Sequence, residues 1–333
     1  MNITDPPPDL EPRFHQPEGW RWHGFERNNG RYLRFGSAFP KKRIPDAVVV
    51  CLPGVREFSE KYFEIARWCL DHNFAFWILD WVGQGKSSRL LKSNPQKRHS
   101  HGFDEDIRDL RYFIDGYIKH SSVHPDKGRI PMVMLGHSMG AHIGLHYLSQ
   151  YPEGFECACF DAPMIGLRAN KNIPQIFGLA LFSVYCFFMG SRYVPKGSNW
   201  ETRSDYANLT SDKARGALER LWAEHVPALR CGDVTYRWIY EAQRSCMNLR
   251  HILKGGQPDL PCLFAFGGRE TLVDNDLAQN SLGFLPQAKI LEYADAGHEI
   301  MMEQDKIRDH FFLHFYNLIK ETILDRPEAL KPF

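Results

Sequence analysis

Short apolar runs alternate with longer stretches of helical period along most of this chain. Runs rich in β-branched and aromatic residues predict buried strands, and apolar positions three or four residues apart predict amphipathic helices. The predicted strands are Ala47–Leu52, Phe74–Asp80, Ile130–Leu135, Cys157–Asp161, Cys262–Phe266 and Ala288–Tyr293. The predicted helices are Lys61–His72, Phe103–Lys119, Gly140–Tyr151 and Asp276–Gly283, with a final helix from about Asp305.

This alternation predicts an α/β fold with a mostly parallel central sheet. Continuously apolar strands separated by helices are typical of a parallel sheet that is covered on both faces. Before them, Arg21–Ser37 contains Asn29-Gly30, a strong hairpin turn signal. We therefore expect an antiparallel edge on this sheet.

The alternation stops between Met164 and Pro258. This stretch holds an apolar run and several polar helical pieces, such as Ser211–His225, but no clear strand. We predict that residues 164–258 form a helical cap inserted over the carboxyl ends of the strands, where open α/β sheets bind their ligands. Residues 21–163 and 259–333 would then form the core, and residues 1–20 an extended N-terminal segment.

Composition narrows the class of protein. Lys and Arg number 41 against 40 Asp and Glu, so the net charge of +1 gives no reason to expect nucleic acid as a partner. The basic runs Pro40–Arg43 and Gln96–His99 are interpreted as solvated loops. Trp81–Ser88 resembles the end of a phosphate-binding loop, but Asp80 stands where that motif needs its first glycine.

Location is predicted from what the chain lacks. The proline-rich, acidic N-terminus has no apolar stretch, so we expect neither a signal peptide nor a membrane span there. Cysteines such as Cys51 and Cys157 lie in strand-like runs without framework spacing, which favours a reduced, cytoplasmic compartment. Ile176–Met189 is free of charge, but its 14 residues fall short of the roughly 20 that cross a bilayer.

The candidate chemistry begins at "GHSMG", Gly136–Gly140, between a predicted strand and a predicted helix. This context is the one that a G-x-S-x-G nucleophile elbow requires. The two glycines avoid clashes around a strained turn that holds the Ser138 hydroxyl at the N-terminus of the next helix. We therefore predict that Ser138 is a nucleophile.

A serine nucleophile needs a base and an acid that orients the base. His298 lies in a loop just after the last predicted strand, from which an imidazole can reach the elbow. For the acid, Glu270 after the preceding strand is preferred, and Asp274 and Asp161 remain alternatives. His142 and His146, behind the serine on one helix face, are interpreted as packing or surface residues.

An oxyanion hole requires backbone N–H donors on two segments. The loop Cys51–Phe58 follows the first parallel strand, and Gly54 allows its chain to approach closely. We expect the donors to be the amides of Val55 and Met139.

Five motifs in order, "PGVREFSEKY", "ILDWVGQGKS", "LGHSMGAH", "RETLVDN" and "AGHEIMME", resemble the α/β-hydrolases. The chain looks most like the bacterial lysophospholipases and the monoacylglycerol lipases, from about Trp20 to the C-terminus and least in the cap. The resemblance implies a Ser–acid–His esterase of lysophospholipids or monoacylglycerols, with no metal and no organic cofactor. It carries the nucleophile, base and acid onto Ser138, His298 and Glu270, and the oxyanion hole onto Val55 and Met139.

The substrate is expected to be a small lipid-like ester. The apolar run in the cap would line a site for an acyl chain, with Phe177, Phe182 and Phe187 as candidate contacts, although ordinary packing would give the same pattern. A peripheral contact of the cap with the inner face of the membrane is kept as a hypothesis. The alternatives are an acyltransferase or an amide- or peptide-cleaving relative, and a non-catalytic binding protein. The sequence does not predict an oligomeric state.

Overall fold

An eight-stranded sheet forms the centre of the molecule. The computed structural model describes residues 8–28, 30–41, 43–125, 128–168, 175–200 and 209–326, without the side chains of residues 175–178, 180 and 181. The strands of the sheet are β1 (Arg21–Glu26), β2 (Tyr32–Ala38), β3 (Ala47–Leu52), β4 (Phe74–Leu79), β7 (Met132–His137), β8 (Phe155–Asp161), β9 (Cys262–Gly267) and β10 (Ala288–Tyr293). A separate two-stranded ribbon joins β5 (Val123–His124) to β6 (Gly128–Arg129).

The strand order is β1-β2-β4-β3-β7-β8-β9-β10. In this order, β4, β3, β7, β8, β9 and β10 run parallel to one another. Strands β1 and β2 form an antiparallel edge, in which Phe25 pairs with Leu33. The predicted fold class is therefore confirmed, including its antiparallel edge. Asn29, half of the predicted turn, lies outside the described residues.

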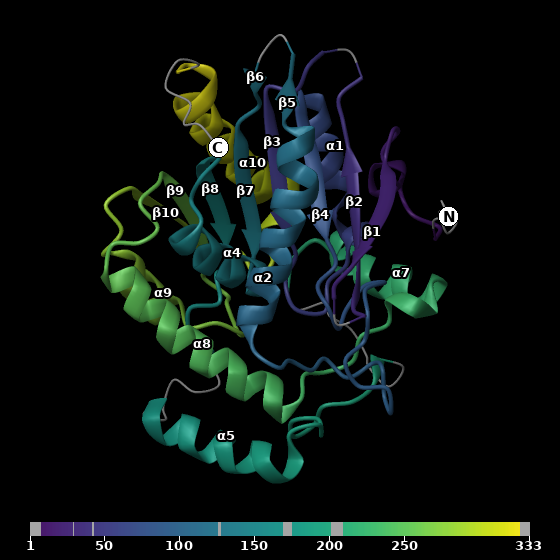
Figure 1. Ribbon diagram of the computed structural model, residues 1–333, viewed down its shortest axis with the longest axis vertical. Helices are drawn as coiled ribbons and strands as arrows, with labels where there is room; N and C mark the ends of the chain where they lie inside the picture. The colour runs from purple at the N-terminus through teal and green to yellow at the C-terminus, as the bar shows by residue number, and fades with distance from the viewer. Residues whose placement is uncertain are drawn as a thin grey trace.

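Helices cover both faces of this sheet (Figure 1). The α-helices are α1 (Phe63–Asp71), α2 (Phe103–Phe113), α3 (Lys119–Ser121), α4 (Met139–Gln150), α5 (Gln175–Met189), α6 (Lys213–Gly216), α7 (Leu218–His225), α8 (Tyr236–Lys254), α9 (Asn275–Leu282) and α10 (Asp305–Ile319). Alternate residues of β3 pack on opposite faces of the sheet. Val48 and Val50 pack with α2 and α4. Val49 and Cys51 pack with α1 and α10. All six β3 residues are buried, so this run needs no polar position.

The predicted elements differ from the observed ones mainly at their ends. The predicted helix Phe103–Lys119 is α2, followed by a π-helical turn over Ile114–Ile118 and by α3. The strand expected from Ile130 begins two residues later, after Pro131, which has no backbone N–H for a ladder. β10 has the predicted bounds, and its mixed burial reflects its place at the edge of the sheet.

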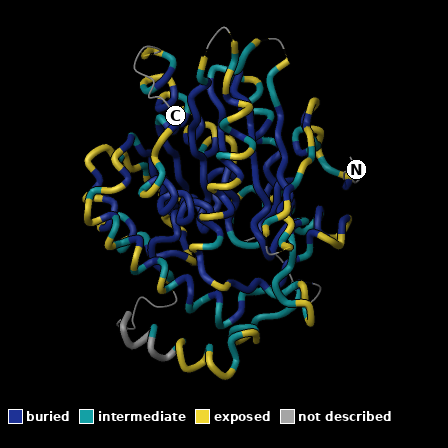
Figure 2. The backbone as a smooth tube through the Cα atoms, viewed as in Figure 1, coloured by how far each residue is buried: buried dark blue, intermediate teal, exposed yellow. Residues whose placement is uncertain are grey.

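Helices α5 to α8 all lie in the chain between β8 and β9, and α5 and α8 lie beyond the carboxyl ends of the strands (Figure 1). Figure 2 shows that the central strands of the sheet are buried, whereas α5 is largely exposed along its described part. α5 packs against α8, and α8 also contacts α2, α4 and α9. None of the helices in the described ranges combines the length and apolar character that crossing a bilayer requires.

Candidate active site

Ser138 occupies a strained turn between β7 and α4. Its backbone has φ 51° and ψ −111°, a conformation that costs a non-glycine residue about 1–3 kcal/mol. Its N–H donates to the carbonyl of Asp161 at 3.0 Å, and its own carbonyl accepts from the amides of His142 and Met164, each at 3.1 Å. These three bonds tie the turn to the end of β8, to α4 and to the segment that follows β8.

The two glycines of the turn are required by close contacts. A Cβ on Gly140 would overlap the backbone carbonyls of Leu52 and Pro53, and one on Gly136 would lie 2.9 Å from the Phe160 ring. Helix α4 therefore starts directly against the end of β3.

His298 and Glu270 complete a hydrogen-bonded chain with this serine. His298 follows β10, and its Nε2 lies 2.9 Å from Ser138 Oγ, which donates to it when Nδ1 carries the ring proton. Nδ1 then donates to Glu270 Oε2 at 2.6 Å. The three residues come from the ends of β7, β9 and β10 and are at least 95% buried, with exposures of 5%, 3% and 2% for serine, histidine and glutamate.

Glu270 is held as an acceptor on both oxygens. Its Oε1 accepts from the amides of Leu272 at 2.6 Å and Val273 at 3.2 Å. Burial alone would raise the pKa of this carboxyl, but the imidazole of His298 and the two amides lower it to about 2. The group is therefore a carboxylate at any physiological pH.

The two alternative acids lie elsewhere. Asp274 Oδ1 accepts from the amide of Leu277 at 3.1 Å and so caps the N-terminus of α9. Asp161 Oδ1 accepts from His137 Nδ1 at 2.6 Å, and its Oδ2 accepts from the amide of Met301 at 3.1 Å. Each carboxylate is engaged with groups other than His298.

The loop after β3 carries Val55, whose amide is one of the two predicted oxyanion-hole donors. Val55 and Ser138 line the same pocket, and Met139 is the first residue of α4. Among the described residues, no hydrogen bond is found from the amide of either Val55 or Met139. Both predicted donors are therefore available to a ligand.

Gln84 fixes the conformation of this loop, a role that the sequence analysis did not predict. Its side-chain Nε2 donates to the carbonyls of Gly54 at 2.8 Å and Glu57 at 2.7 Å. Its Oε1 accepts from the amide of Arg56 at 2.9 Å and from Arg98 Nε at 3.1 Å. One fully buried amide thus ties both sides of the loop that carries Val55.

The prediction that Gln96–His99 forms a solvated loop is wrong. Arg98 and His99 are only 1% and 5% exposed. Besides Gln84, the Arg98 guanidinium donates to the carbonyl of His99 at 2.7 Å and reaches Met139 Sδ at 3.5 Å. The basic run is therefore part of the site's support. The prediction failed because these buried contacts of Arg98 leave no pattern in the sequence.

A cavity of about 410 Å³ opens onto Ser138 and His298. One part of its wall is apolar and comprises Met164, Leu167, Trp238, Ile239, Leu272 and Val273; another is charged and comprises Arg56, Glu219 and Asp233. The predicted aromatic contacts of α5 are not among its described lining. Phe182 packs near Tyr185 and Tyr236, Phe187 is 84% exposed, and the side chain of Phe177 lies outside the described residues. Helix α5 packs on the outer side of α8, so Phe187 faces away from this cavity, whereas the call on Phe177 stays a prediction.

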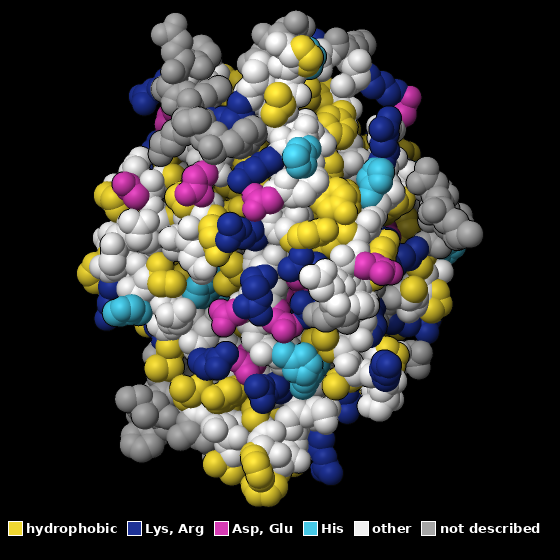
Figure 3. Space-filling model, in the orientation of Figure 1, with side chains coloured by type: hydrophobic (Ala, Val, Ile, Leu, Met, Phe, Trp, Pro, Cys, Tyr) yellow, Lys and Arg dark blue, Asp and Glu magenta, His cyan; other side chains and the backbone are white. Residues whose placement is uncertain are grey.

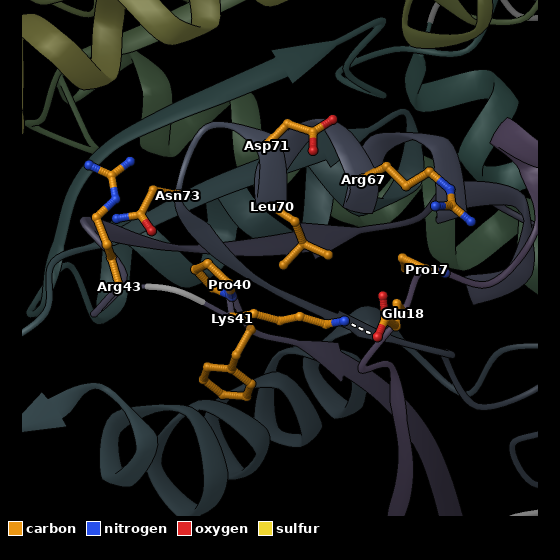
Figure 4. Close-up of a pocket in the computed structure, with 10 residues that line it drawn as sticks. Pro17, Glu18, Pro40, Lys41, Arg43, Arg67, Leu70, Asp71 and Asn73 are labelled. Atoms are coloured by element: carbon orange, nitrogen blue, oxygen red, sulfur yellow. Dashed lines mark ion pairs between the residues drawn. The ribbon is translucent and has the colours of Figure 1, made fainter.

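A larger cavity, about 470 Å³, lies at the other end of the sheet, near the amino-terminal ends of the central strands. Its lining includes Arg43 and Asn73, which precede β3 and β4, and an ion pair between Lys41 and Glu18 (Figure 4). The described residues that line it include neither a serine nor a histidine.

The comparisons with known proteins agree with this geometry. Residues 43–305 match the family described as serine aminopeptidase, S33. The chain belongs to this family of hydrolases. It is 25% identical to a probable lysophospholipase L2 of Haemophilus influenzae over 81% of this chain and 84% of that protein, and 27% identical to lysophospholipase L2 of Escherichia coli K12 over 86% and 84%.

Solved structures confirm the fold of the family. A soluble variant of the Saccharomyces cerevisiae monoglyceride lipase superposes with a TM-score of 0.69 at 17% identity, covering 95% of this chain and 100% of the other. At that identity the likeness concerns the fold alone. Together with the lysophospholipase relatives, the family match confirms the expected resemblance to the α/β-hydrolases and the expected class, carboxylic-ester hydrolase.

A cluster of buried charged side chains lies beside the candidate site of this hydrolase. Glu57, His137 and Glu299 bring ligand atoms within 4.8 Å of one another, an arrangement that could hold a metal ion. Lys61 Nζ, however, already donates to Glu57 Oε1 and Glu299 Oε1, each at 2.7 Å. The lysine ammonium thus supplies the positive charge that a cation would bring.

His137, next to the nucleophile in sequence, carries part of this charge. Burial disfavours its protonation, but the carboxylates of Asp161 and Glu57 raise its pKa to about 9. Its ring centroid lies 4.8 Å from that of His298. The sequence held one signal of the His137–Asp161 pair, since Asp161 ends the strand beside the elbow.

Gly140→Ala is expected to destabilise the fold by at least about 3 kcal/mol, because the new Cβ meets backbone rather than a flexible side chain. Urea unfolding followed by circular dichroism measures this. Gly116→Ala is the matched control, with nothing within 4 Å of its added Cβ and an expected change within about 1 kcal/mol. Equal stability of the two variants would contradict the close approach.

The stabilising effect of the His137–Asp161 pair is expected to depend on pH. Since the pKa of His137 rises from about 6.5 in the unfolded chain to about 9, its contribution is complete below about pH 6.5 and is lost as the pH rises through 9. The difference in melting temperature between the wild type and His137→Gln should therefore shrink from pH 6 to pH 10. A constant difference would argue against a protonated His137.

Proposed function

We propose that this enzyme hydrolyses the acyl ester of a lysophospholipid or a monoacylglycerol through an acyl-enzyme on Ser138. The observation that carries the proposal is the hydrogen-bonded chain from Ser138 Oγ through His298 to Glu270, in a cavity with one apolar and one charged wall. The names of the relatives supply the class of substrate.

In the first half-reaction, Ser138 Oγ attacks the acyl carbonyl carbon while its proton moves to His298 Nε2. The carbonyl oxygen becomes an oxyanion that accepts from the amides of Val55 and Met139. Loss of one such donor typically costs about 3–4 kcal/mol of barrier. The intermediate then expels the alcohol, to which His298 returns the proton.

In the second half-reaction, water repeats the sequence on the acyl-enzyme. His298 takes the proton of the water, the C–Oγ bond breaks, and the fatty acid leaves as Ser138 regains its proton. Throughout, the carboxylate of Glu270 stabilises the imidazolium and keeps Nδ1 protonated, so that Nε2 points at the serine.

We further propose that residues 164–258 act as a cap over the site and bring it to a membrane surface. The described end of α5 exposes Val184 (58%), Tyr185 (37%), Phe187 (84%) and Phe188 (75%). Figure 3 shows hydrophobic side chains gathered at the lower end of the molecule, where α5 lies. Arg192 and Lys196 follow as exposed cations, a combination suited to an anionic bilayer.

Glu270→Gln is expected to lower kcat by about 10⁴, because an amide cannot stabilise the imidazolium. Ser138→Ala is expected to lower kcat by about 10⁶. Asp274→Asn is the matched control, since asparagine also caps a helix and should leave kcat nearly unchanged. Steady-state hydrolysis of a fatty-acyl ester measures all three, and equal losses in Glu270→Gln and Asp274→Asn would contradict the assignment of the acid.

The same assay tests the lipid substrate when the acyl chain is varied from two to sixteen carbons on glycerol and on a glycerophosphodiester. A rise in kcat/KM with chain length supports the proposal, since each buried methylene contributes about 0.8 kcal/mol. A flat profile would remove the lipid substrate, and transfer of the acyl group to an added alcohol in preference to water would indicate an acyltransferase.

Phe187→Ser combined with Phe188→Ser is expected to weaken binding to phosphatidylglycerol-containing vesicles by about tenfold or more, because two exposed rings are lost. Sedimentation with vesicles measures this. Leu313→Ser on α10, at a residue 55% exposed elsewhere on the surface, is the control. Equal binding by both variants would contradict contact through α5.

A further inference from the structure

Three consecutive peptide groups form the loop after β3, and the middle one, between Gly54 and Val55, differs from its neighbours. The amide of Gly54 donates to Glu57 Oε2, and the amide of Arg56 donates to Gln84 Oε1 at 2.9 Å. Among the described residues, no acceptor is found for the amide of Val55. In this run, the N–H of Val55 is therefore the donor left for a ligand.

The carbonyl of the same peptide group is held firmly. Gln84 Nε2 donates to the Gly54 carbonyl at 2.8 Å. The bond between Gly54 and Val55 is trans, so the N–H of Val55 points away from this carbonyl and hence away from Gln84. The hydrogen bond at the oxygen thus sets the direction of the amide.

This peptide group needs such a restraint because it follows a glycine. Gly54 has no Cβ, so its backbone rotates with less steric resistance than that of any other residue. If the peptide plane turned over, a carbonyl oxygen would stand where a developing oxyanion requires a donor. The bond from Gln84 opposes this rotation.

The orientation of the Gln84 amide is itself determined by its surroundings. Arg98 Nε donates to Oε1 at 3.1 Å, beside the amide of Arg56. A guanidinium and a backbone N–H offer only donors, so the atom that they face must be the oxygen. Nε2 then faces the carbonyls of Gly54 at 2.8 Å and Glu57 at 2.7 Å. The fully buried amide thus uses both of its N–H groups and accepts two bonds at its oxygen.

Arg98 is anchored on both its backbone and its side chain. Its amide donates to the carbonyl of Asp233 at 3.1 Å, and its carbonyl accepts from the amide of Thr235 at 3.0 Å. Its Nη2 lies 3.5 Å from the Sδ atom of Met139, whose amide is the other predicted donor. Arg98 and Gln84 therefore connect the two segments that carry the predicted oxyanion hole.

We propose that Gln84, oriented by Arg98, is a positioning residue that locks the peptide group between Gly54 and Val55 with its N–H available to the oxyanion. The inference rests on the proposed hydrolysis through Ser138. A hydrogen bond at a peptide oxygen also polarises the peptide group and strengthens its N–H as a donor. Loss of Gln84 weakens stabilisation of the transition state and leaves binding of the ground-state ester largely intact.

The first test is Gln84→Met in the full-length protein, because methionine is of similar length and cannot donate to the Gly54 carbonyl. On a short-chain ester, kcat is expected to fall by about a hundredfold, as when an oxyanion-hole donor is removed or misplaced. KM should stay within about threefold of the wild-type value, since binding of the ester does not use this donor. Steady-state kinetics measures both constants.

The second measurement is inhibition by an alkyl trifluoromethyl ketone. Its carbonyl carbon bonds to Ser138 Oγ, the serine proton moves to His298, and the carbonyl oxygen becomes an oxyanion. The inhibition constant should rise by about the same hundredfold in Gln84→Met, because this adduct resembles the transition state. A side chain that served only the stability of the fold would not change the two constants in parallel.

Asn73→Leu is the matched control for lost stability. The side-chain amide of Asn73 is also buried, and it donates to the carbonyl of Ile44 at 3.0 Å and to Asp46 Oδ2 at 2.8 Å, at the other end of the sheet. The variant should lower the melting temperature but keep kcat and the inhibition constant within about twofold of the wild type.

The outcomes separate the two proposals. Wild-type values of kcat and of the inhibition constant in Gln84→Met would overturn the positioning role and leave ester hydrolysis intact. Equal losses of kcat in Gln84→Met and Asn73→Leu would also overturn it. Wild-type hydrolysis by Ser138→Ala would instead overturn the proposed function.

A crystal structure of the wild type with the trifluoromethyl ketone keeps the inference testable if Gln84→Met does not fold. The Gly54 carbonyl should still accept from Gln84 Nε2, and the amide of Val55 should donate to the oxygen of the adduct. A peptide group turned the other way, with its carbonyl toward the adduct, would overturn the inference.

Discussion

The close approach of α4 to the end of β3 is the constraint on which the active site depends. Without a side chain at Gly140, the first turn of α4 packs directly against the carbonyls of Leu52 and Pro53 at the end of β3, and without one at Gly136 the elbow packs against the ring of Phe160 in β8. That packing forces the left-handed backbone of Ser138 and aims its hydroxyl away from the sheet. The loop after β3 then begins beside the first turn of α4, and its residue Val55 lines the same cavity as Ser138.

Charge compensation below the serine follows from this geometry. The carboxyl ends of the parallel strands lie at one end of the sheet, and five titratable groups meet there, namely Glu57, Lys61, His137, Asp161 and Glu299. Lys61 lies between two carboxylates, and His137 lies against Asp161. Each charge is therefore compensated without solvent, and the field at His298 is set by fixed groups. Such preorganised charge is what a reaction with a transient oxyanion requires.

The sequence predicted the parts of the structure that depend on local signals. The bounds of β3 and β10 follow from uninterrupted or alternating apolar runs, and the elbow follows from glycine spacing. Asp274 could also have been separated from Glu270, because the residues after it read as a helix with an aspartate cap. The roles of Gln84 and Arg98 were not predictable, since Gln84 donates to the distant loop after β3 and Arg98 reaches both Gln84 and Met139. Phe187 was misplaced for a similar reason, because periodicity does not reveal which side of a helix meets the protein.

The hydrogen bonds at Met164 bear on how any cap could move. Met164 is the first residue of the predicted cap, yet its amide donates to the carbonyl of Ser138 and its own carbonyl accepts from the His142 ring at 2.7 Å. A little farther on, Arg250 donates to the carbonyl of Ile165 at 2.6 Å. Met164 and Ile165 are therefore mechanically part of the nucleophile elbow rather than of the cap. If the cap opened by a hinge at Met164 and Ile165, the motion would displace Ser138. Substrate can therefore enter without disturbing the catalytic alignment only if the hinge lies outside these two residues.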